Sequence, residues 1–468
     1  MKRLFALLSV IILFVSCNKD DQPSGNDTTN PATVQLFNMD EVPSVTLEFA
    51  LADWNKLLTN YDQNPMNEKK VVARFRYSGS GREVALDSIG LRLRGNTSRR
   101  RPEGAEGQLH NAANPDWHHC HFGLDFPQYR DGQRFAGKEK LVLKWFKDDA
   151  AYAREIYCYD LFRRAGVWTA PRASYCRVTI KVDGDARAAN YGVYAMIESV
   201  DEDYISSRQN DWGMGVGYLW KGGYDTSGHN ANFVSTASMG VENVEMDASQ
   251  SEYFAYDLKT RKNDIATAKA GLTDFITQLN SRTGNDFKQW IAQQMDVDLF
   301  LKTYAVNVMV GMWDDYWVNG NNFYFYFAGN GRAYFIPYDY DNTLGTSQLM
   351  PNSGTRDPLA WGSSTTAPLI TKLLAISEYR QKYKDYISEL IDPANGLFAA
   401  AASKARIQQW HAMISPYVSN DTGEDMAIQD VPAPWGNAPF YRLLSGNALG
   451  GTNGAANWFE TRAGSVGW

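Results

Sequence analysis

Residues 313–341 read WDDYWVNGNNFYFYFAGNGRAYFIPYDYD, and this stretch decides the fold of the second half of the chain. Aromatic residues at 322–327 and 334–337 predict two strands, and the GNG sequence between them predicts the turn of a hairpin. A hairpin brings its two ends back to the same edge of a sheet. We therefore expect Asp314, which precedes the hairpin, to face Asp339, which follows it.

The segments on either side of this hairpin contain the side chains that metal-dependent phosphoryl transfer requires. Carboxylate and amide oxygens suit Mg²⁺, which prefers one or two carboxylates together with phosphate oxygens. The reaction also needs a carboxylate beside the acceptor hydroxyl and a lysine beside the phosphates. Loops rich in Asp and Asn are also common in turns that bind no ligand, and we assign that structural role to Asp315, Asp341 and Asn342. The full set is Asp314, Asp315, Asn319, Asn321, Asn322, Asp339, Asp341 and Asn342.

Helices are predicted before this stretch, at 252–280 and 296–312. The second of them carries an apolar stripe at helical spacing. Such a stripe is expected to pack in the core and not to bind a cofactor. Its members are Val297, Phe300, Leu301, Tyr304, Ala305 and Val308.

The first half of the chain predicts strands around one helix. The helix is expected to begin at residues 148–149 and to run to Ala165, because Asp149 suits its start and Gly166 suits its end. Together with the helical second half, this pattern predicts an α+β protein with a twisted antiparallel sheet. The expected strands are 45–49, 71–77, 89–94, 140–145, 176–182 and 192–197, the last two joined as a hairpin across Asp183-Gly184.

The composition limits the domain organisation and the partners. The chain has 468 residues, of which 44% are hydrophobic, so we expect two lobes or one domain with large insertions. Its formal net charge is -7, and no run of five or more Lys or Arg occurs. Proteins that bind nucleic acid need a concentrated positive surface, so nucleic acid is excluded as an expected partner.

The segment 117–121, WHHCH, contains three histidines and a cysteine, which are common metal ligands. Neighbouring residues of a strand point to opposite faces, so only His119 with His121, or His118 with Cys120, could share a site. Two ligands are too few for a structural metal site. We therefore predict exposed strand histidines.

The N-terminus has the pattern of a lipoprotein signal. Residues 1–17 combine Lys2 and Arg3 with a short apolar run that ends at Cys17, where a bacterial lipobox places its acylated cysteine. The run is too short to span a bilayer comfortably. The residues that follow, 18–33, are rich in Asn, Asp, Thr and Pro and predict a flexible tether. We expect a chain held by lipid on Cys17 at the outer membrane or cell surface.

Several motifs, in order along the chain, resemble those of the spore coat protein H (CotH) family. The hairpin region matches best, because Asp314-Asp315-Tyr316, residues 322–326 and Pro337-Tyr338-Asp339-Tyr340 are similar to three consecutive family motifs. The run Lys19-Asp20-Asp21 also resembles the acidic signals of Bacteroidetes surface lipoproteins. The other similar segments are Arg94-Gly95-Asn96-Thr97-Ser98, 140–144, Ala153-Arg154-Glu155, 192–198, 218–221 and 458–462.

The resemblance implies an atypical protein-kinase-like fold of two lobes that transfers phosphate from ATP to proteins. It implies a β-rich N-lobe at 34–203 and a mainly helical C-lobe at 204–468. Asp314 would take the catalytic position, and Asp339 would bind Mg²⁺ with Asn322 or Asn319. The residues implied to bind nucleotide are Lys144 paired with Glu155, the turn at Arg94 and Asn96, and Glu198 at a hinge.

Two questions stay open at the level of sequence. Lys140 lies on the same strand face as Lys144 and is a second candidate for the phosphate-binding lysine. The second question is whether the chain is instead a non-catalytic adhesin or glycan-binding lipoprotein that recognises a surface ligand. Its aromatic residues could stack on sugars, and the candidates are Trp145, Trp212, Trp220, Trp313 and Trp317.

Overall fold

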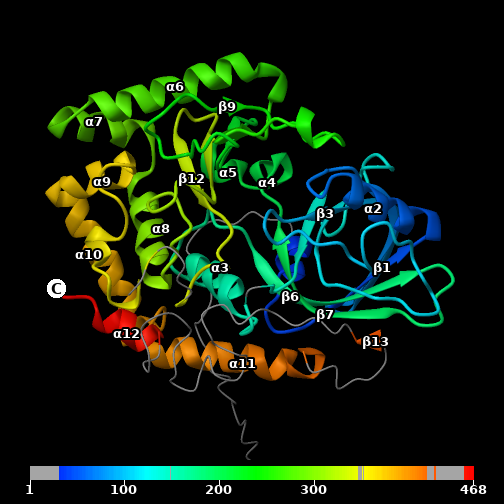
Figure 1. Cartoon of the computed structure of the whole chain (residues 1–468). Helices are drawn as coiled ribbons and strands as arrows, with labels where there is room; N and C mark the ends of the chain where they lie inside the picture. The colour runs from blue at the N-terminus through cyan, green and yellow to red at the C-terminus, as the bar shows by residue number, and fades with distance from the viewer. Residues whose placement is uncertain (1–30, 148, 346–349, 351–352, 419–425, 428–457) are drawn as a thin grey trace, which may run out of the picture.

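The computed structural model describes residues 31–147, 149–345, 350, 353–418, 426–427 and 458–468. The expected mixture of helices and sheets is confirmed, and Figure 1 shows the strands of the first half beside the helices of the second. The signal segment and Cys17 lie outside the described residues. The expected tether ends earlier than 33, because helix α1, Pro31–Leu36, includes its last three residues.

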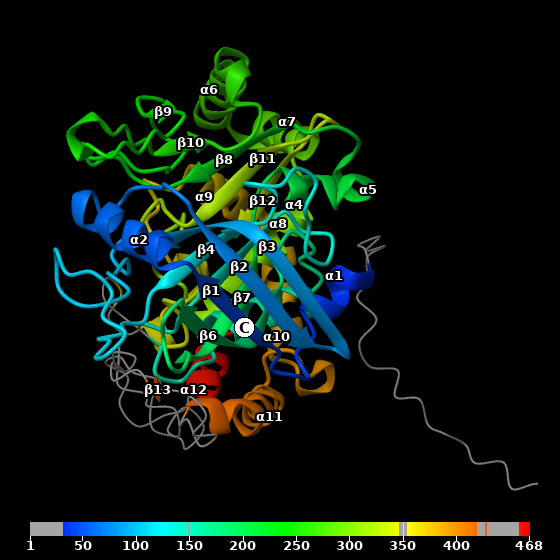
Figure 2. The same cartoon turned by 90° about the vertical axis from the view of Figure 1, so that its right-hand side faces the viewer.

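The strands of the first half close into a seven-stranded barrel, which fills the right-hand side of Figure 1 and faces the viewer in Figure 2. The expectation of an antiparallel sheet is therefore incomplete. Strand β1 pairs antiparallel with β2 and parallel with β6, and this second pairing removes the free edges. The order around the barrel is β7-β5-β4-β3-β2-β1-β6, and β6 pairs again with β7. The strands are β1 Ser44–Phe49, β2 Val71–Gly79, β3 Arg82–Arg94, β4 His121–Asp125, β5 Lys140–Lys144, β6 Ala173–Val182 and β7 Ala189–Glu198.

Alternation along these strands separates the barrel interior from its outer face. Leu93, Phe122 and Leu143 lie opposite one another on β3, β4 and β5, and all three belong to the apolar core of the barrel. The neighbouring residues of each strand therefore point outward. Helix α2, Leu51–Gln63, which sequence reasoning missed, contributes Trp54 to the same core.

The second half is built on a smaller sheet covered by helices. Its strand order is β12-β11-β8-β10-β9, and the expected hairpin of β11 and β12 is confirmed. These strands are β8 Tyr218–Gly222, β9 Met239–Gly240, β10 Tyr256–Leu258, β11 Phe323–Phe327 and β12 Ala333–Pro337, and β13 Met426–Ala427 pairs with β7. The remaining helices are α3 Arg154–Arg164, α4 Glu202–Ser206, α5 Gln209–Trp212, α6 Ile265–Ser281, α7 Gly284–Gln294, α8 Val297–Val310, α9 Pro368–Ala375, α10 Ser377–Ile391, α11 Ala400–Val418 and α12 Trp458–Gly464.

Helix α8 is the predicted helix that the structure confirms most closely. Asp296 caps its start by accepting a hydrogen bond from the Leu299 N–H at 3.0 Å. Gly311 ends it with a φ of 74°, a left-handed conformation that glycine adopts without strain. The expected helix at 252–280 begins later, at Ile265, because Tyr256–Leu258 pairs with β8 as a strand.

Helix α3 also begins later than expected, at Arg154. Asp149 lies outside the helix but still caps its first turn. Its carboxylate accepts hydrogen bonds from the N–H groups of Ala153, at 2.9 Å, and of Arg154, at 2.8 Å. It also pairs with the Arg154 guanidinium at 2.6 Å. The acidic residue thus stabilises the helix start, as predicted, although it lies five positions before the first helical residue.

A clear division into two lobes is not what the structure shows. The outer face of the barrel, with Val142 and Ala195, belongs to the same apolar core as α3 and α8. Helix α3 lies between the barrel and α8 in Figure 1, and it contacts both β6 and α8. Because this core is continuous, the barrel is joined to the helical part by packing and not by a hinge.

Candidate active site

The site is centred on the ammonium group of Lys144, at the end of β5. Its Nζ lies 2.8 Å from a carboxylate oxygen of Glu155, in the first turn of α3. It also pairs with Asp339 and lies 3.0 Å from Asp341, both in the loop after β12. Burial by itself would lower the pKa of Lys144, but the three carboxylates outweigh this effect and hold that pKa well above its ordinary value.

The loop that carries Asp339 is fixed by α3. The Asp339 N–H donates to the Tyr159 hydroxyl at 3.1 Å, and the Tyr340 N–H donates to Glu155 at 3.3 Å. Asp339 has a φ of 63°, so a non-glycine residue is held in the left-handed region. Conformations of this kind persist only where the surroundings enforce them, and they concentrate at functional sites.

Asp314 lies in the loop after α8 and is surrounded by amide donors. The side-chain N–H groups of Asn319, Asn322 and Asn321 lie 2.7, 3.0 and 3.3 Å from its carboxylate oxygens. Burial, and then the charge of Asp339, raise the pKa of Asp314 above its ordinary value although these amides oppose the shift. The two aspartates therefore influence each other electrostatically, as expected for the two ends of the hairpin.

Of the acidic residues assigned a structural role, one fits that role and one contacts the site. Asp315 is buried, accepts from the Val318 N–H at 3.0 Å and from the Asn307 amide at 2.7 Å, and so shapes the loop. Burial raises the pKa of Asp315 to about 7. Asp341 instead contacts Lys144, which sequence reasoning missed. Its position two residues after Asp339, in the same loop, was the feature of the sequence that could have indicated this contact.

The turn at the end of β3 lies against this loop. Arg94 donates to the Tyr338 hydroxyl at 3.2 Å. Asn96 donates to the Tyr224 hydroxyl. Lys221 of β8 lies over the Tyr338 ring, 5.7 Å from its centroid. Sequence reasoning assigned no role to Lys221, although it forms part of a segment that resembles the family.

The other expected nucleotide-binding residues lie apart from Lys144. Glu198 pairs with Arg208 at 2.7 Å and with Lys138 at 2.8 Å, and its backbone N–H donates to the Arg172 carbonyl at 2.9 Å. Lys140 is 42% exposed, and its ammonium lies 3.7 Å from Asp201. Of the two candidate lysines, Lys144 is therefore the one that the structure brings to the acidic loops.

The prediction of exposed histidines at 117–121 is wrong, because His119 and His121 are buried and His118 is half-buried. His119 is buried, stacks on Trp145 with ring centroids 4.4 Å apart, and its Nε2 lies 2.8 Å from the Tyr191 carbonyl. His121 is buried beside Lys144, and burial, followed by that charge, lowers its pKa to about 3. The reason is tertiary, because His119 packs against Trp145 and Tyr191 of the barrel itself, and His121 lies between the neighbouring strands β3 and β5.

The tryptophans considered as sugar-stacking platforms are structural. Each of the five is at most 3% exposed, so none presents a ring face to solvent. Trp317 donates to the Ser363 carbonyl at 3.1 Å and so helps to hold the loop that carries Asp314. The structure thus removes the observation on which the adhesin interpretation was based.

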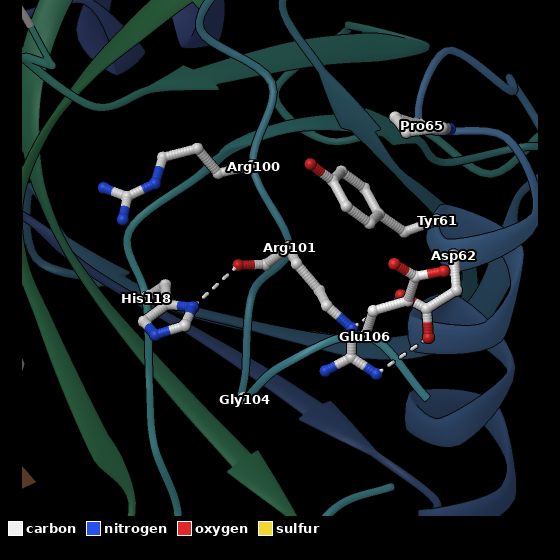
Figure 3. A pocket seen from close by; sticks show the side chains of 8 residues that line it. All are labelled: Tyr61, Asp62, Pro65, Arg100, Arg101, Gly104, Glu106 and His118. Atoms are coloured by element: carbon white, nitrogen blue, oxygen red, sulfur yellow. Dashed lines mark hydrogen bonds and ion pairs between the residues drawn. The ribbon is translucent and has the colours of Figure 1, made fainter. Parts of the chain in front are cut away.

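A separate cavity of about 370 Å³ lies on the loop after β3, beside α2, as Figure 3 shows. In that view Arg101 reaches Asp62, and the Arg101 carbonyl faces the His118 ring. None of its lining residues belongs to the expected site. They are Tyr61, Asp62, Pro65, Arg100, Arg101, Gly104, Glu106 and His118.

The donors around Lys144 fit Mg²⁺ in kind. Asp339 and Asp341 offer carboxylate oxygens there, and Asn322, whose amide nitrogen donates to Asp314, has an amide oxygen; all of these are hard ligands. Within the described residues, no group of three or more His, Cys, Asp or Glu side chains is arranged to hold a metal ion by itself. A metal here would therefore need oxygen atoms from a bound ligand, which is the usual situation for Mg²⁺ with phosphates. In the same part of the chain, no helix is both long and apolar enough to cross a membrane.

These features define an α+β protein in which a barrel lysine, paired with a helix glutamate, meets two acidic loops. The chain belongs to the CotH kinase family, since the family described as "CotH kinase protein" matches residues 91–440. The chain is similar to the inner spore coat protein H of Bacillus subtilis (strain 168), with 26% identity over 290 residues, which cover 61% of this chain and 71% of that protein. It is also similar to spore coat protein homolog 1 of Rhizopus delemar, with 21% identity over 445 residues, 92% of this chain and 63% of that protein.

Proposed function

We propose that this chain is a kinase that transfers the terminal phosphoryl group of Mg²⁺–ATP to a hydroxyl group of a protein. The observation that carries the proposal is the ion-pair cluster of Lys144, Glu155 and Asp339. It joins β5 and α3, which follow one another in the chain, to the loop after β12, 195 positions from Lys144, and it leaves a cation and hard oxygen ligands side by side. Phosphoryl transfer depends on such a combination, because catalysis consists mainly of positioning and charge stabilisation.

Each residue of the cluster has a distinct role in the proposal. Lys144 binds phosphate oxygens, and Glu155 holds its ammonium group in place. Asp339 binds Mg²⁺, with Asn322 or Asn319 as a further ligand. Arg94 and Asn96 lie on the turn that would cover the phosphates. The barrel part, 34–203, and the helical part, 204–468, would then act as the two halves of a kinase-like domain.

Asp314 is the proposed general base. The acceptor hydroxyl oxygen attacks the γ-phosphorus, the bond from that phosphorus to the β–γ bridging oxygen breaks, and ADP leaves with the bond electrons. The hydroxyl proton passes to the Asp314 carboxylate. The amides of Asn319 and Asn322 hold that carboxylate in one orientation, and a raised pKa makes it a better proton acceptor than an ordinary aspartate.

The experiment that tests the proposal compares Asp339→Asn with Asp314→Asn in titrations of a Mg²⁺–nucleotide analogue. Asp339→Asn is expected to weaken metal-dependent nucleotide binding and turnover together. Asp314→Asn is expected to retain nucleotide binding and to slow turnover by roughly 10²- to 10⁴-fold, the contribution typical of a general base. Lys144→Ala is expected to lose nucleotide affinity, whereas Lys140→Ala, its matched control on the same strand, is expected to keep it.

Thermal unfolding of each variant comes first, so that a lost function is not a lost fold. Asp385→Asn, an exposed substitution on α10, controls for the effect of removing a negative charge. Full nucleotide binding by Asp339→Asn would contradict its metal role. If the wild-type protein bound no nucleotide at all, the kinase proposal would fail, and a non-catalytic role in binding a surface ligand would replace it.

A further inference from the structure

His121 stands between two cationic side chains on the outer face of the barrel. The register pairs Arg94 of β3 with His121 of β4, and it pairs Phe122 with Leu143 of β5, which sets His121 opposite Lys144. Residues opposite one another on adjacent strands point to the same side of a sheet. Since Leu93, Phe122 and Leu143 point into the barrel, the row formed by Arg94, His121 and Lys144 points out of it, toward the acidic loops.

The hydrogen bond at Nδ1 of His121 shows which ring nitrogen carries the proton. The backbone N–H of Trp145 donates to Nδ1 of His121 at 2.9 Å. A ring nitrogen that accepts a hydrogen bond carries no proton, so the imidazole is neutral and its proton is on Nε2. Nε2 is therefore a hydrogen-bond donor.

This donor is buried and has no partner. His121 is 3% exposed, and its Nε2 makes no hydrogen bond within the described part of the chain. A buried donor without a partner is unfavourable, because it has lost its hydrogen bonds to water and gained none in return. Gly95 lies close to the same ring, because a Cβ added there would lie 3.2 Å from Cδ2 of His121.

The charges on either side indicate what kind of acceptor fits. Arg94 makes one hydrogen bond, to the neutral Tyr338 hydroxyl, and forms no ion pair with a carboxylate among the described residues. Lys144 lies on the other side of His121, where it contacts the acidic loop. The charged groups that influence the His121 ring are Lys144, Asp339, Arg94 and Lys147. Three of these four are cations, so an anionic oxygen is the acceptor that suits this position.

We propose that His121 is a phosphate-binding residue, whose Nε2–H donates to an oxygen of the nucleotide phosphates between Arg94 and Lys144. The inference rests on the proposed function and names a residue which that function did not include. A neutral donor adds specificity for phosphate oxygens without adding to the positive charge of Arg94 and Lys144.

The test uses two substitutions of His121, each of which preserves a hydrogen-bonding group near one of the two ring nitrogens. His121→Asn places an amide oxygen near the position of Nδ1, so it can still accept from Trp145 while it removes the Nε2 donor. His121→Gln reaches the position of Nε2 and can donate there. Binding of Mg²⁺–ATP analogue, of tripolyphosphate without metal, and of adenosine is measured by calorimetry on the folded domain. His118→Asn, the same substitution three residues earlier in the chain, is the matched control.

We expect His121→Asn to weaken binding of the ATP analogue and of tripolyphosphate roughly 10-fold or more, which is typical of a lost hydrogen bond to a charged group. Adenosine affinity should not change, and His121→Gln should recover part of the loss. Nitrogen-15 spectra of the ligand-free protein should show the proton on Nε2, and that signal should shift when tripolyphosphate is added.

The failures of the two proposals can be told apart. If His121→Asn folds and binds phosphates as tightly as the wild type, His121 holds only a water molecule or nothing, and this inference is wrong while the kinase proposal stands. A proton on Nδ1 would overturn it independently. If the wild type binds tripolyphosphate through His121 but binds no nucleotide, the anion site stands and the kinase proposal fails. Binding of neither probe by the wild type would contradict both.

Discussion

At the scale of single residues, Glu198 shows how a side chain with a functional appearance can serve the fold. Its carboxylate is buried among Arg208, Lys138 and Arg172. Burial would raise the pKa of Glu198, but the three cations outweigh it and hold that pKa well below its ordinary value. The ion pairs join the end of β7 to the segment after α4, so we assign Glu198 a role in stability.

The substitution Glu198→Gln is expected to lower the free energy of unfolding by about 3 kcal/mol at pH 7, because it leaves buried cations without their partner. The folded-state pKa of Glu198 lies below that of the unfolded chain, which is about 4.3. Its contribution is therefore complete above that value and is lost as the pH falls toward the folded-state pKa. Urea unfolding at pH 7, 5 and 4 should show the difference between variant and wild type shrink as the pH falls.

Glu202→Gln, at an exposed position of α4, is the matched control and should change stability by less than about 0.5 kcal/mol. Equal stability of Glu198→Gln and the wild type at pH 7 would show that the ion pairs contribute nothing. A loss of nucleotide affinity without a loss of stability would instead support the hinge role that the family resemblance implies.

At the scale of elements, the C-terminal helix α12 donates hydrogen bonds to the last turn of α8, which leads into the loop with Asp314. The last carbonyls of a helix have no partner within it. Trp458 donates to the Met309 carbonyl at 3.2 Å, and Arg462 donates to the Val308 carbonyl at 2.9 Å. Gly311 makes room for this contact, because a Cβ there would lie 2.3 Å from the Trp458 ring. Helix α12 therefore helps to position the loop that carries Asp314.

Arg462→Ala is expected to destabilise the protein by about 2–4 kcal/mol, since it removes a fully buried side chain together with its hydrogen bonds to the Val308 and Arg356 carbonyls. Hydrogen exchange should become faster at the end of α8 and in the loop that follows. Glu460→Ala, on the same helix but at the surface, should have little effect. Exchange rates at the end of α8 that match the wild type would show that α12 does not support this loop.

At the scale of the whole molecule, the barrel and the helical part form one packed body, to which the proposed lipid anchor is attached at Cys17. The described chain begins at residue 31, and the first strand of the barrel begins at Ser44. We propose that acylation acts on location alone, because Cys17 precedes every helix and strand in the part of the chain that the structure describes.

Cys17→Ser is therefore expected to leave thermal unfolding of the protein unchanged and to move it from the detergent phase to the aqueous phase of a phase-separation experiment. Metabolic labelling with a fatty acid would report the loss of the lipid directly. A Cys17→Ser protein that still followed the membrane fraction, or a wild type that took up no label, would mean that the anchor assignment is wrong.

The sequence by itself determined the α+β class, most strands of the barrel, the hairpin of β11 and β12, and helix α8 with its caps. These features depend on periodicity and on end residues that act within a few positions, so they can be recognised without the rest of the chain. The family resemblance also pointed to Lys144, Glu155, Asp314 and Asp339, although it left Lys140 as an alternative.

Only the tertiary structure decided how these parts meet. The barrel closes because β1 pairs with β6, more than a hundred residues away, and Lys144 meets Asp339 across 195 positions. The same packing buries His119 and His121, which had been expected at the surface, and the tryptophans that had been considered as sugar-stacking residues. Such contacts depend on which faces of distant elements come together, and a local pattern of residues contains no information on that choice.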